Sequence, residues 1–230
     1  MYEFVSKKEV LFARNEIEPI IHRVQNYLRD NNILTFQYNL VGSASNHRHL
    51  VTRIVGGNKG FDMDYNLILK QLNPKFNDAK IIKFKIMEAF DKFLPKNYKR
   101  EDSSSAITLK KIDQLHKKII YSFDFAIVNY YFEDIKNPDF DDEYDELDNE
   151  YFSIERQEII LFNKHNKSYG WELRPIASDH RYMEQYVKSE SYIWNELRDE
   201  YLKHKNLELT KKSRVIYYET LNRIYKKHFN

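Results

Sequence analysis

Two segments in which apolar and polar side chains alternate constrain the fold of this chain more than any other feature. Residues 61–69 carry apolar side chains at every second position, which leaves Asp62 and Asp64 together on the other face of a predicted strand. Residues 119–128 show the same alternation and leave Asp124 on their polar face, between two small residues. Because aspartate is disfavoured within strands, three carboxylates placed in this way indicate a shared chemical role.

The chemistry of three neighbouring carboxylates favours a cation between them. Their charges repel one another unless a metal ion neutralises them. The chain has no cysteine, so a metal would be held by oxygen or imidazole, and oxygen ligands favour hard cations. We therefore expect Asp62, Asp64 and Asp124 to bind Mg²⁺ or Mn²⁺. Two such ions about 4 Å apart can activate an attacking hydroxyl and stabilise a leaving pyrophosphate.

A turn at Gly42-Ser43 follows a predicted strand at residues 36–40 and forms a candidate phosphate site. Because glycine has no side chain, the backbone can approach a phosphate closely, and the Ser43 hydroxyl and nearby N–H groups can donate to its oxygens. Ser45, Arg48 and Lys59 are further candidates for contacts with a nucleotide. The alternative for the last two is that they are ordinary solvated turn residues.

The remaining pattern predicts an α+β fold, with a small mixed β-sheet, helices packed on one face of it, and further helices at the C-terminus. Helical spacing of apolar residues predicts helices over residues 10–28, 82–94, 178–204 and 210–228. Strand patterns predict a hairpin between 50–55 and 61–69, antiparallel strands at 105–112 and 117–132, and a hairpin at 158–174. We expect a core over residues 1–132, an acidic loop over 133–150, and a β-hairpin and helical pair over 151–230 that pack on the core.

The charge of the chain is unevenly distributed. Ten of its 35 acidic residues but one of its 37 basic residues lie between Glu133 and Glu150, so the rest of the chain is strongly basic. A basic body suits a polyanionic ligand such as a nucleotide or nucleic acid, although a solvated lysine-rich face also explains it. No apolar run is long enough to span a bilayer and the start lacks the order of a signal peptide, so we expect a soluble, cytoplasmic protein without a membrane partner.

Taken together, the order of Gly42-Ser43, Asp62-x-Asp64 and Asp124 on strands after a leading helix resembles the DNA polymerase β-like nucleotidyltransferase superfamily. The resemblance covers about residues 10 to 130. It implies that Gly42 and Ser43 hold a triphosphate tail, that Asp62 and Asp64 bind both metals, and that Asp124 assists the nucleophile. Ser43 and Asp62 are 19 positions apart, which exceeds the usual interval, so no branch of the superfamily is assigned.

The function expected from this resemblance is metal-dependent transfer of a nucleoside monophosphate from an NTP to an acceptor hydroxyl, with release of pyrophosphate. The basic body favours a nucleotide or RNA as the acceptor. The alternative is a catalytically inactive module on the same fold that binds nucleotide, RNA or a protein partner. Base preference and oligomeric state are not encoded in these motifs.

Overall fold

The computed structural model of the chain describes residues 1–45, 48–133, 155–163, 168–174 and 178–229. Its helices are α1 (Lys7–Asp30), α2 (Ala79–Phe93), α3 (Ser178–Ser189), α4 (Ser191–Leu207) and α5 (Ser213–Phe229). Its strands are β1 (Tyr2–Phe4), β2 (Leu34–Val41), β3 (Thr52–Ile54), β4 (Lys59–Leu72), β5 (Tyr98–Asp102), β6 (Ile107–Asp113), β7 (Lys118–Glu133), β8 (Glu155–Asn163) and β9 (Tyr169–Leu173). Most of the predicted acidic loop, residues 134–150, lies outside the described residues.

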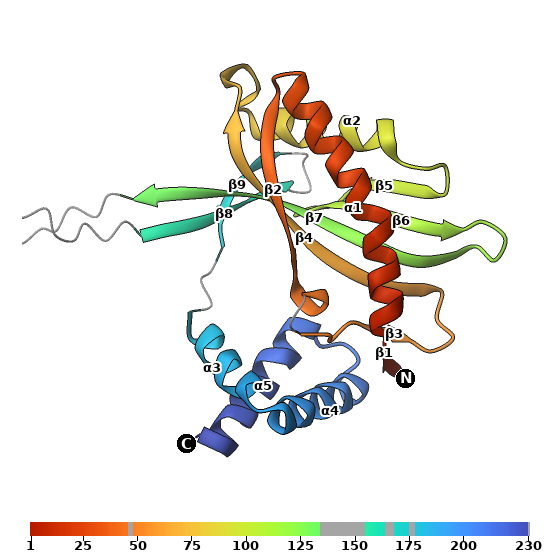
Figure 1. The fold of residues 1–230 in the computed structure, drawn as a ribbon, viewed down its shortest axis with the longest axis vertical. Coiled ribbons are helices and arrows are strands. Elements are labelled where there is room, and N and C mark those ends of the chain that lie inside the picture. The colour runs from red at the N-terminus through yellow and green to blue at the C-terminus, as the bar shows by residue number, and fades with distance from the viewer. Residues whose placement is uncertain (46–47, 134–154, 164–167, 175–177, 230) are drawn as a thin grey trace, which may run out of the picture.

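A seven-stranded mixed sheet forms the centre of the molecule (Figure 1). Strands β2, β4, β7, β6 and β5 follow one another across it, and β4 and β7 are parallel while the other pairs are antiparallel. The edge of β7 that pairs with β6 over residues 118–125 pairs with β8 over residues 128–133, and β8 in turn pairs with β9. The predicted α+β class, the antiparallel β6–β7 pair and the β8–β9 hairpin are confirmed.

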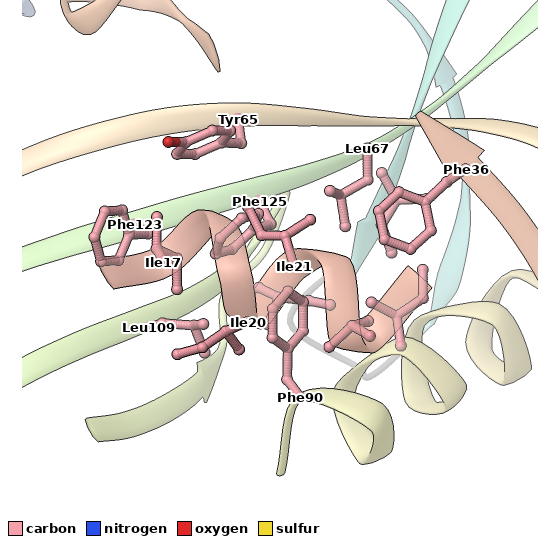
Figure 2. Packing of buried hydrophobic residues seen from close by; sticks show 14 of the residues in the cluster. Ile17, Ile20, Ile21, Phe36, Tyr65, Leu67, Phe90, Leu109, Phe123 and Phe125 are labelled. Atoms are coloured by element: carbon pink, nitrogen blue, oxygen red, sulfur yellow. The ribbon is translucent and has the colours of Figure 1, made fainter. Parts of the chain in front are cut away.

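The hydrophobic core lies between one face of this sheet and helices α1 and α2. Apolar side chains at alternate positions of β4 and β7 point into it, and Figure 2 shows Tyr65 and Phe125 facing Ile21 of α1 and Phe90 of α2. Helix α1 begins with a capping box in which Ser6 and Glu9 satisfy each other's backbone N–H groups. Because the core occupies one face, the carboxylates of β4 and β7 lie on the other.

The predicted hairpin between residues 50–55 and 61–69 is wrong. Strand β3 pairs with β1 at the N-terminus, in a separate two-stranded sheet. Strand β2 takes one edge of β4 over residues 64–72 and β7 takes the other over residues 59–68, so most of both edges of β4 is occupied by strands other than β3. Arg53 strengthens the actual pairing through ion pairs with Glu3 of β1 and Glu9 of α1, at 2.7 and 2.5 Å.

The single helix predicted over residues 178–204 is also wrong, because the chain forms α3 and α4 with a break at Glu190, whose backbone is extended. In one continuous helix, Val187 and Ile193 would point about 120° apart. The break brings both into the same small core, which they share with α5 and with Leu50. In Figure 1 the three helices lie together, away from the central sheet and beside β1 and β3.

Among the residues that the structure describes, no helix combines the length and the apolar character that crossing a membrane requires.

Candidate active site

The parallel pairing of β4 with β7 brings the predicted carboxylates together. Asp64 stands directly opposite Asp124 in the register, and Asp62 stands opposite Ser122, one row away. All three aspartates lie on the face of the sheet that α1 and α2 leave uncovered. Asp62 is exposed, whereas Asp64 and Asp124 are half-buried.

The electrostatics of Asp62, Asp64 and Asp124, here called the carboxylate row, reflect burial and mutual repulsion. Burial raises the pKa of Asp64 to about 6, and the negative charges of Asp124 and Asp62 add to the effect. Burial also raises the pKa of Asp124, while a hydrogen bond from Thr108 opposes the change. Carboxylates that resist ionisation side by side are suited to a bound cation, which would favour their charged form.

Hydroxyl groups hold two of the three carboxylates. Ser122 donates a hydrogen bond to Oδ1 of Asp62, and Thr108 donates one of 2.5 Å to Oδ1 of Asp124. Ser122 lies on β7 and Thr108 on β6, so the partners come from the strands next to their carboxylates. These hydroxyls could be recognised in the sequence only after the strand pairing was known.

The Gly-Ser turn packs against the same row. Gly42 to Ala44 form one turn of 3₁₀ helix at the end of β2, and Gly42 has a φ of +66°. A Cβ on Gly42 would lie 2.6 Å from Oδ2 of Asp64, closer than atoms can approach. The turn therefore requires glycine both for its backbone conformation and for its contact with the carboxylate. This contact places a candidate phosphate site beside the candidate metal ligands.

The donor set at this site is made of carboxylate oxygens, which fits Mg²⁺ or Mn²⁺. Asp62, Asp64 and Asp124 share one face, and burial together with the charges of Asp124 and Asp62 raises the pKa of Asp64. Their oxygens do not yet converge, and no group of three or more such side chains in the described parts of the chain has the geometry of a preformed metal centre. Side-chain rotations would have to bring them onto an ion.

The three further nucleotide-contact candidates have different surroundings. Ser45 follows the turn directly, and its N–H donates to the carbonyl of Gly42 at 3.4 Å. Arg48 makes a bidentate ion pair with Glu184 of α3, at 2.9 and 2.5 Å, and lies over the ring of Tyr217. Its guanidinium is thus engaged with the helical bundle, and its contact with a phosphate stays a prediction.

Lys59 lies on the wrong side of the sheet for a contact with the carboxylates. In the register of β4 it alternates with Phe61 and Met63, which point into the core, so it does not share the face of Asp62 and Asp64. Its side chain is exposed at the end of the strand. Residues two positions apart on a strand point to the same face, so the alternating pattern of the sequence already implied that Lys59 shares the core face with Phe61.

Lys205 of α4 is a candidate site residue that sequence reasoning missed. Its Nζ donates to the hydroxyls of Thr52 and Ser213, at 2.6 and 2.8 Å. Burial lowers its pKa to about 8, and the charge of Asp62 partly offsets this change. The helical bundle therefore brings an ammonium group close enough to Asp62 to interact with that carboxylate electrostatically. No local pattern singles out this lysine among the many in the chain.

Comparison of the sequence with protein-family models and with curated protein sequences gave no significant match. Comparison of the structure with solved structures gave significant matches. Escherichia coli DncV with bound 3′-deoxy GTP aligns with a TM-score of 0.52 and 10% identity, over 98% of this chain and 55% of that one. Elizabethkingia meningoseptica CdnE cyclic dinucleotide synthase, with GTP and Apcpp, aligns with a TM-score of 0.50 and 12% identity, over 96% and 82%.

The alignments cover nearly all of this chain, including the helical bundle. The chain spans about half the length of the DncV chains, as the match to the Vibrio cholerae di-nucleotide cyclase illustrates with 54% of that chain covered. At these identities the likeness concerns the fold. The chain thus shares the fold of DncV and CdnE, which agrees with the mixed sheet and helices that the sequence predicted.

Proposed function

We propose that this protein is a metal-dependent nucleotidyltransferase that moves a nucleoside monophosphate from an NTP to an acceptor hydroxyl. The observation that carries the proposal is the parallel register that sets Asp64 opposite Asp124, with the Gly42 turn packed against Asp64. This arrangement supports the proposal because it sets the backbone of the Gly42 turn, a candidate phosphate site, beside a row of carboxylates. Donor and acceptor would meet over the uncovered face of the sheet.

The residues divide into a donor side and an acceptor side. The N–H groups and hydroxyl of Gly42 and Ser43 would bind the triphosphate, and the Lys205 ammonium would offset its charge. Asp62, Asp64 and Asp124 would hold Mg²⁺ or Mn²⁺, which supply positive charge to the reacting phosphate and to the leaving pyrophosphate.

In the reaction, the acceptor oxygen forms a bond to the α-phosphorus while the bond to pyrophosphate breaks. Asp124 stands opposite Asp64 and would orient the acceptor hydroxyl and receive its proton. Its Oδ1 accepts the hydrogen bond from Thr108, which leaves its other oxygen for the acceptor.

For the acceptor, a second nucleotide is the class we propose. The proteins that share the fold are a cyclic dinucleotide synthase and DncV, and they were solved with GTP, 3′-deoxy GTP or an ATP analogue bound. The basic excess outside residues 133–150 also favours an anionic acceptor. RNA carries the same charge and is the second acceptor to test.

The test is incubation with each of the four NTPs labelled at the α-phosphate, singly and in pairs, with Mg²⁺ or Mn²⁺ and with or without total RNA. We expect pyrophosphate release and a labelled dinucleotide or RNA product. Asp62→Ala and Asp124→Ala should abolish both signals, while circular dichroism shows that the fold is kept. Equal turnover by wild type and both variants would refute the proposal.

A nucleotide-binding module without catalysis is the second candidate. It is favoured by one observation, the lack of convergence of the carboxylates onto a preformed metal centre in the described parts of the chain. The two candidates differ in thermal stability with a non-hydrolysable NTP. An enzyme should be stabilised only when Mg²⁺ or Mn²⁺ is added with the nucleotide, and Asp64→Ala should remove that shift, whereas a binding module should show a shift without metal.

A further inference from the structure

A chain of hydroxyl groups leads away from the carboxylate row toward the loop before β6. Thr108 stands opposite Asp124 in the β6–β7 register, is 7% exposed, and donates its hydroxyl proton to Oδ1 of Asp124 at 2.5 Å. Oγ of Ser103 lies 2.7 Å from Oγ1 of Thr108. A hydroxyl has one proton, so Thr108 cannot donate to both neighbours, and Ser103 must be the donor to Thr108. The hydrogen bonds thus run in one direction, from Ser103 through Thr108 to Asp124.

A buried lysine holds the start of this chain in place. Lys83 of α2 is 1% exposed, and its Nζ donates to the backbone carbonyl of Ser103 at 2.7 Å and pairs with Oδ1 of Asp102 at 2.6 Å. The hydroxyl of Tyr169 on β9 donates to Oδ2 of Asp102, also at 2.6 Å. An ammonium group inside a protein is costly unless it is paired and hydrogen-bonded. Here those contacts fix Asp102 and the backbone of Ser103, the residue with which the hydroxyl chain begins.

The direction of these hydrogen bonds determines which oxygen of Asp124 can contact other groups. One of its oxygens is occupied by Thr108, which fixes the plane of the carboxylate and leaves Oδ2 for other partners. Partners that orient a metal ligand in this way commonly change metal affinity or activity by about 10- to 100-fold when they are removed. In the described structure, Ser122 makes an equivalent bond to Asp62, whereas it is the backbone of the Gly42 turn that lies against Asp64.

We propose that Thr108 is a positioning residue for the transfer reaction, backed by Ser103, and that it orients Asp124 toward the acceptor hydroxyl and the metal. This inference rests on the proposed function, because it assigns a role within the same site. Thr108 does not touch the substrate in this role. It acts through Asp124, and Lys83 acts one step further away by holding the loop of Ser103.

The variants that test this role change one hydroxyl at a time. Thr108→Val keeps the size and shape of the side chain and removes the donor, whereas Thr108→Ser keeps the donor and removes a methyl group. Ser103→Ala removes the second hydroxyl. Thr220→Val is the matched control, because Thr220 is also buried and its hydroxyl donates to the backbone of α5, far from the site.

We expect Thr108→Val to lower kcat by about 10- to 100-fold and to change KM for the NTP by less than about threefold, because the triphosphate binds at the Gly42 turn. Thr108→Ser should restore kcat to within about threefold of wild type, and Ser103→Ala should lower it several-fold. Thr220→Val should lose thermal stability and keep kcat. A wild-type kcat in Thr108→Val, or equal loss in the valine and serine variants, would overturn the positioning role.

A second measurement separates this inference from the proposed function. Mn²⁺ binding is followed by electron paramagnetic resonance of the free ion, with a non-hydrolysable NTP present. We expect Thr108→Val to weaken Mn²⁺ binding by about tenfold or more while Thr108→Ser and Thr220→Val bind as wild type does. If the wild-type protein transferred no nucleotide, the proposed function would fail, and equal Mn²⁺ affinity in Thr108→Val and wild type would still overturn the role of Thr108.

Discussion

Replacing Asp64 by asparagine should make the protein more stable while it abolishes catalysis. Burial and the charges of Asp124 and Asp62 raise the pKa of Asp64 to about 6 from an ordinary value of 3.8. At about 1.4 kcal/mol per pKa unit, the ionised carboxylate costs the folded state about 3 kcal/mol above pH 6. An asparagine side chain has no charge but must still be desolvated, so we expect a net gain of about 1–3 kcal/mol in the free energy of unfolding at pH 7.5.

The pH dependence follows from the proton balance. Between about pH 3.8 and pH 6 the folded protein keeps the proton on Asp64 while the unfolded chain releases it. The folded state then binds more protons, so the stability of the wild type falls as the pH rises through this range. Asparagine does not titrate. The advantage of Asp64→Asn should therefore be small at pH 4 and complete above about pH 7.

The assay is urea unfolding followed by circular dichroism, at pH 4.5 and pH 7.5 with EDTA present, alongside exposed Asp199 changed to asparagine as a control. The control should stay within about 0.5 kcal/mol of wild type. Mg²⁺ with a non-hydrolysable NTP should stabilise the wild type and leave Asp64→Asn unchanged, which reverses the order of the two proteins. Lower stability of Asp64→Asn than of wild type at pH 7.5 in EDTA, or the same difference at both pH values, would refute the reasoning.

Three further perturbations test the surroundings of the site. Gly42→Ala should lower the free energy of unfolding by about 1–3 kcal/mol and remove most activity, because Gly42 has a φ of +66° and an added Cβ would meet a carboxylate. Gly56 has a φ of +69° but open space around it, so Gly56→Ala should lower the free energy of urea unfolding by about 1 kcal/mol and keep activity. Burial raises the pKa of Glu184, but hydrogen bonds from Arg48 and Lys188 outweigh it and hold that pKa at about 2. Glu184→Gln should thus lose about 1–3 kcal/mol at pH 7, and the loss should shrink as the pH falls from 4.5 toward 2. Lys205→Met should raise KM for the NTP by about tenfold, measured by pyrophosphate release, while thermal unfolding shows a folded protein.

The strand faces could be predicted because they depend on a local period. In β4 and β7 every second side chain enters the core, so an alternating sequence reveals which residues are buried without knowledge of the strand order. The same period places Asp62, Asp64 and Asp124 on the uncovered face. It also implies that Lys59 lies on the core face, away from the three carboxylates, and the contact of Lys59 with a nucleotide stays a prediction.

Other parts of the site depend on contacts between distant segments. Lys205 reaches Thr52 because α4 packs beside the β1–β3 sheet, and Thr108 reaches Asp124 because β6 pairs with β7 in one particular register. A lysine in a helix and a threonine in a strand have nothing in their neighbourhood that distinguishes them from others of their kind. Sequence patterns of short range therefore predicted the carboxylates and missed the residues that hold or neutralise them.

The long interval between Ser43 and Asp62 has a structural explanation in the helical bundle. The segment between them contributes Leu50 to the core of that bundle, and Arg48 to the ion pair with Glu184. Leu50 also donates its N–H to the carbonyl of Ser43, so the segment returns to the turn from which it departed. A shorter connection from the turn to β4 would lack the residues that make these contacts. The added length thus joins the candidate phosphate turn to the helices that carry Lys205, and displacement of the bundle would disturb the turn as well as the lysine.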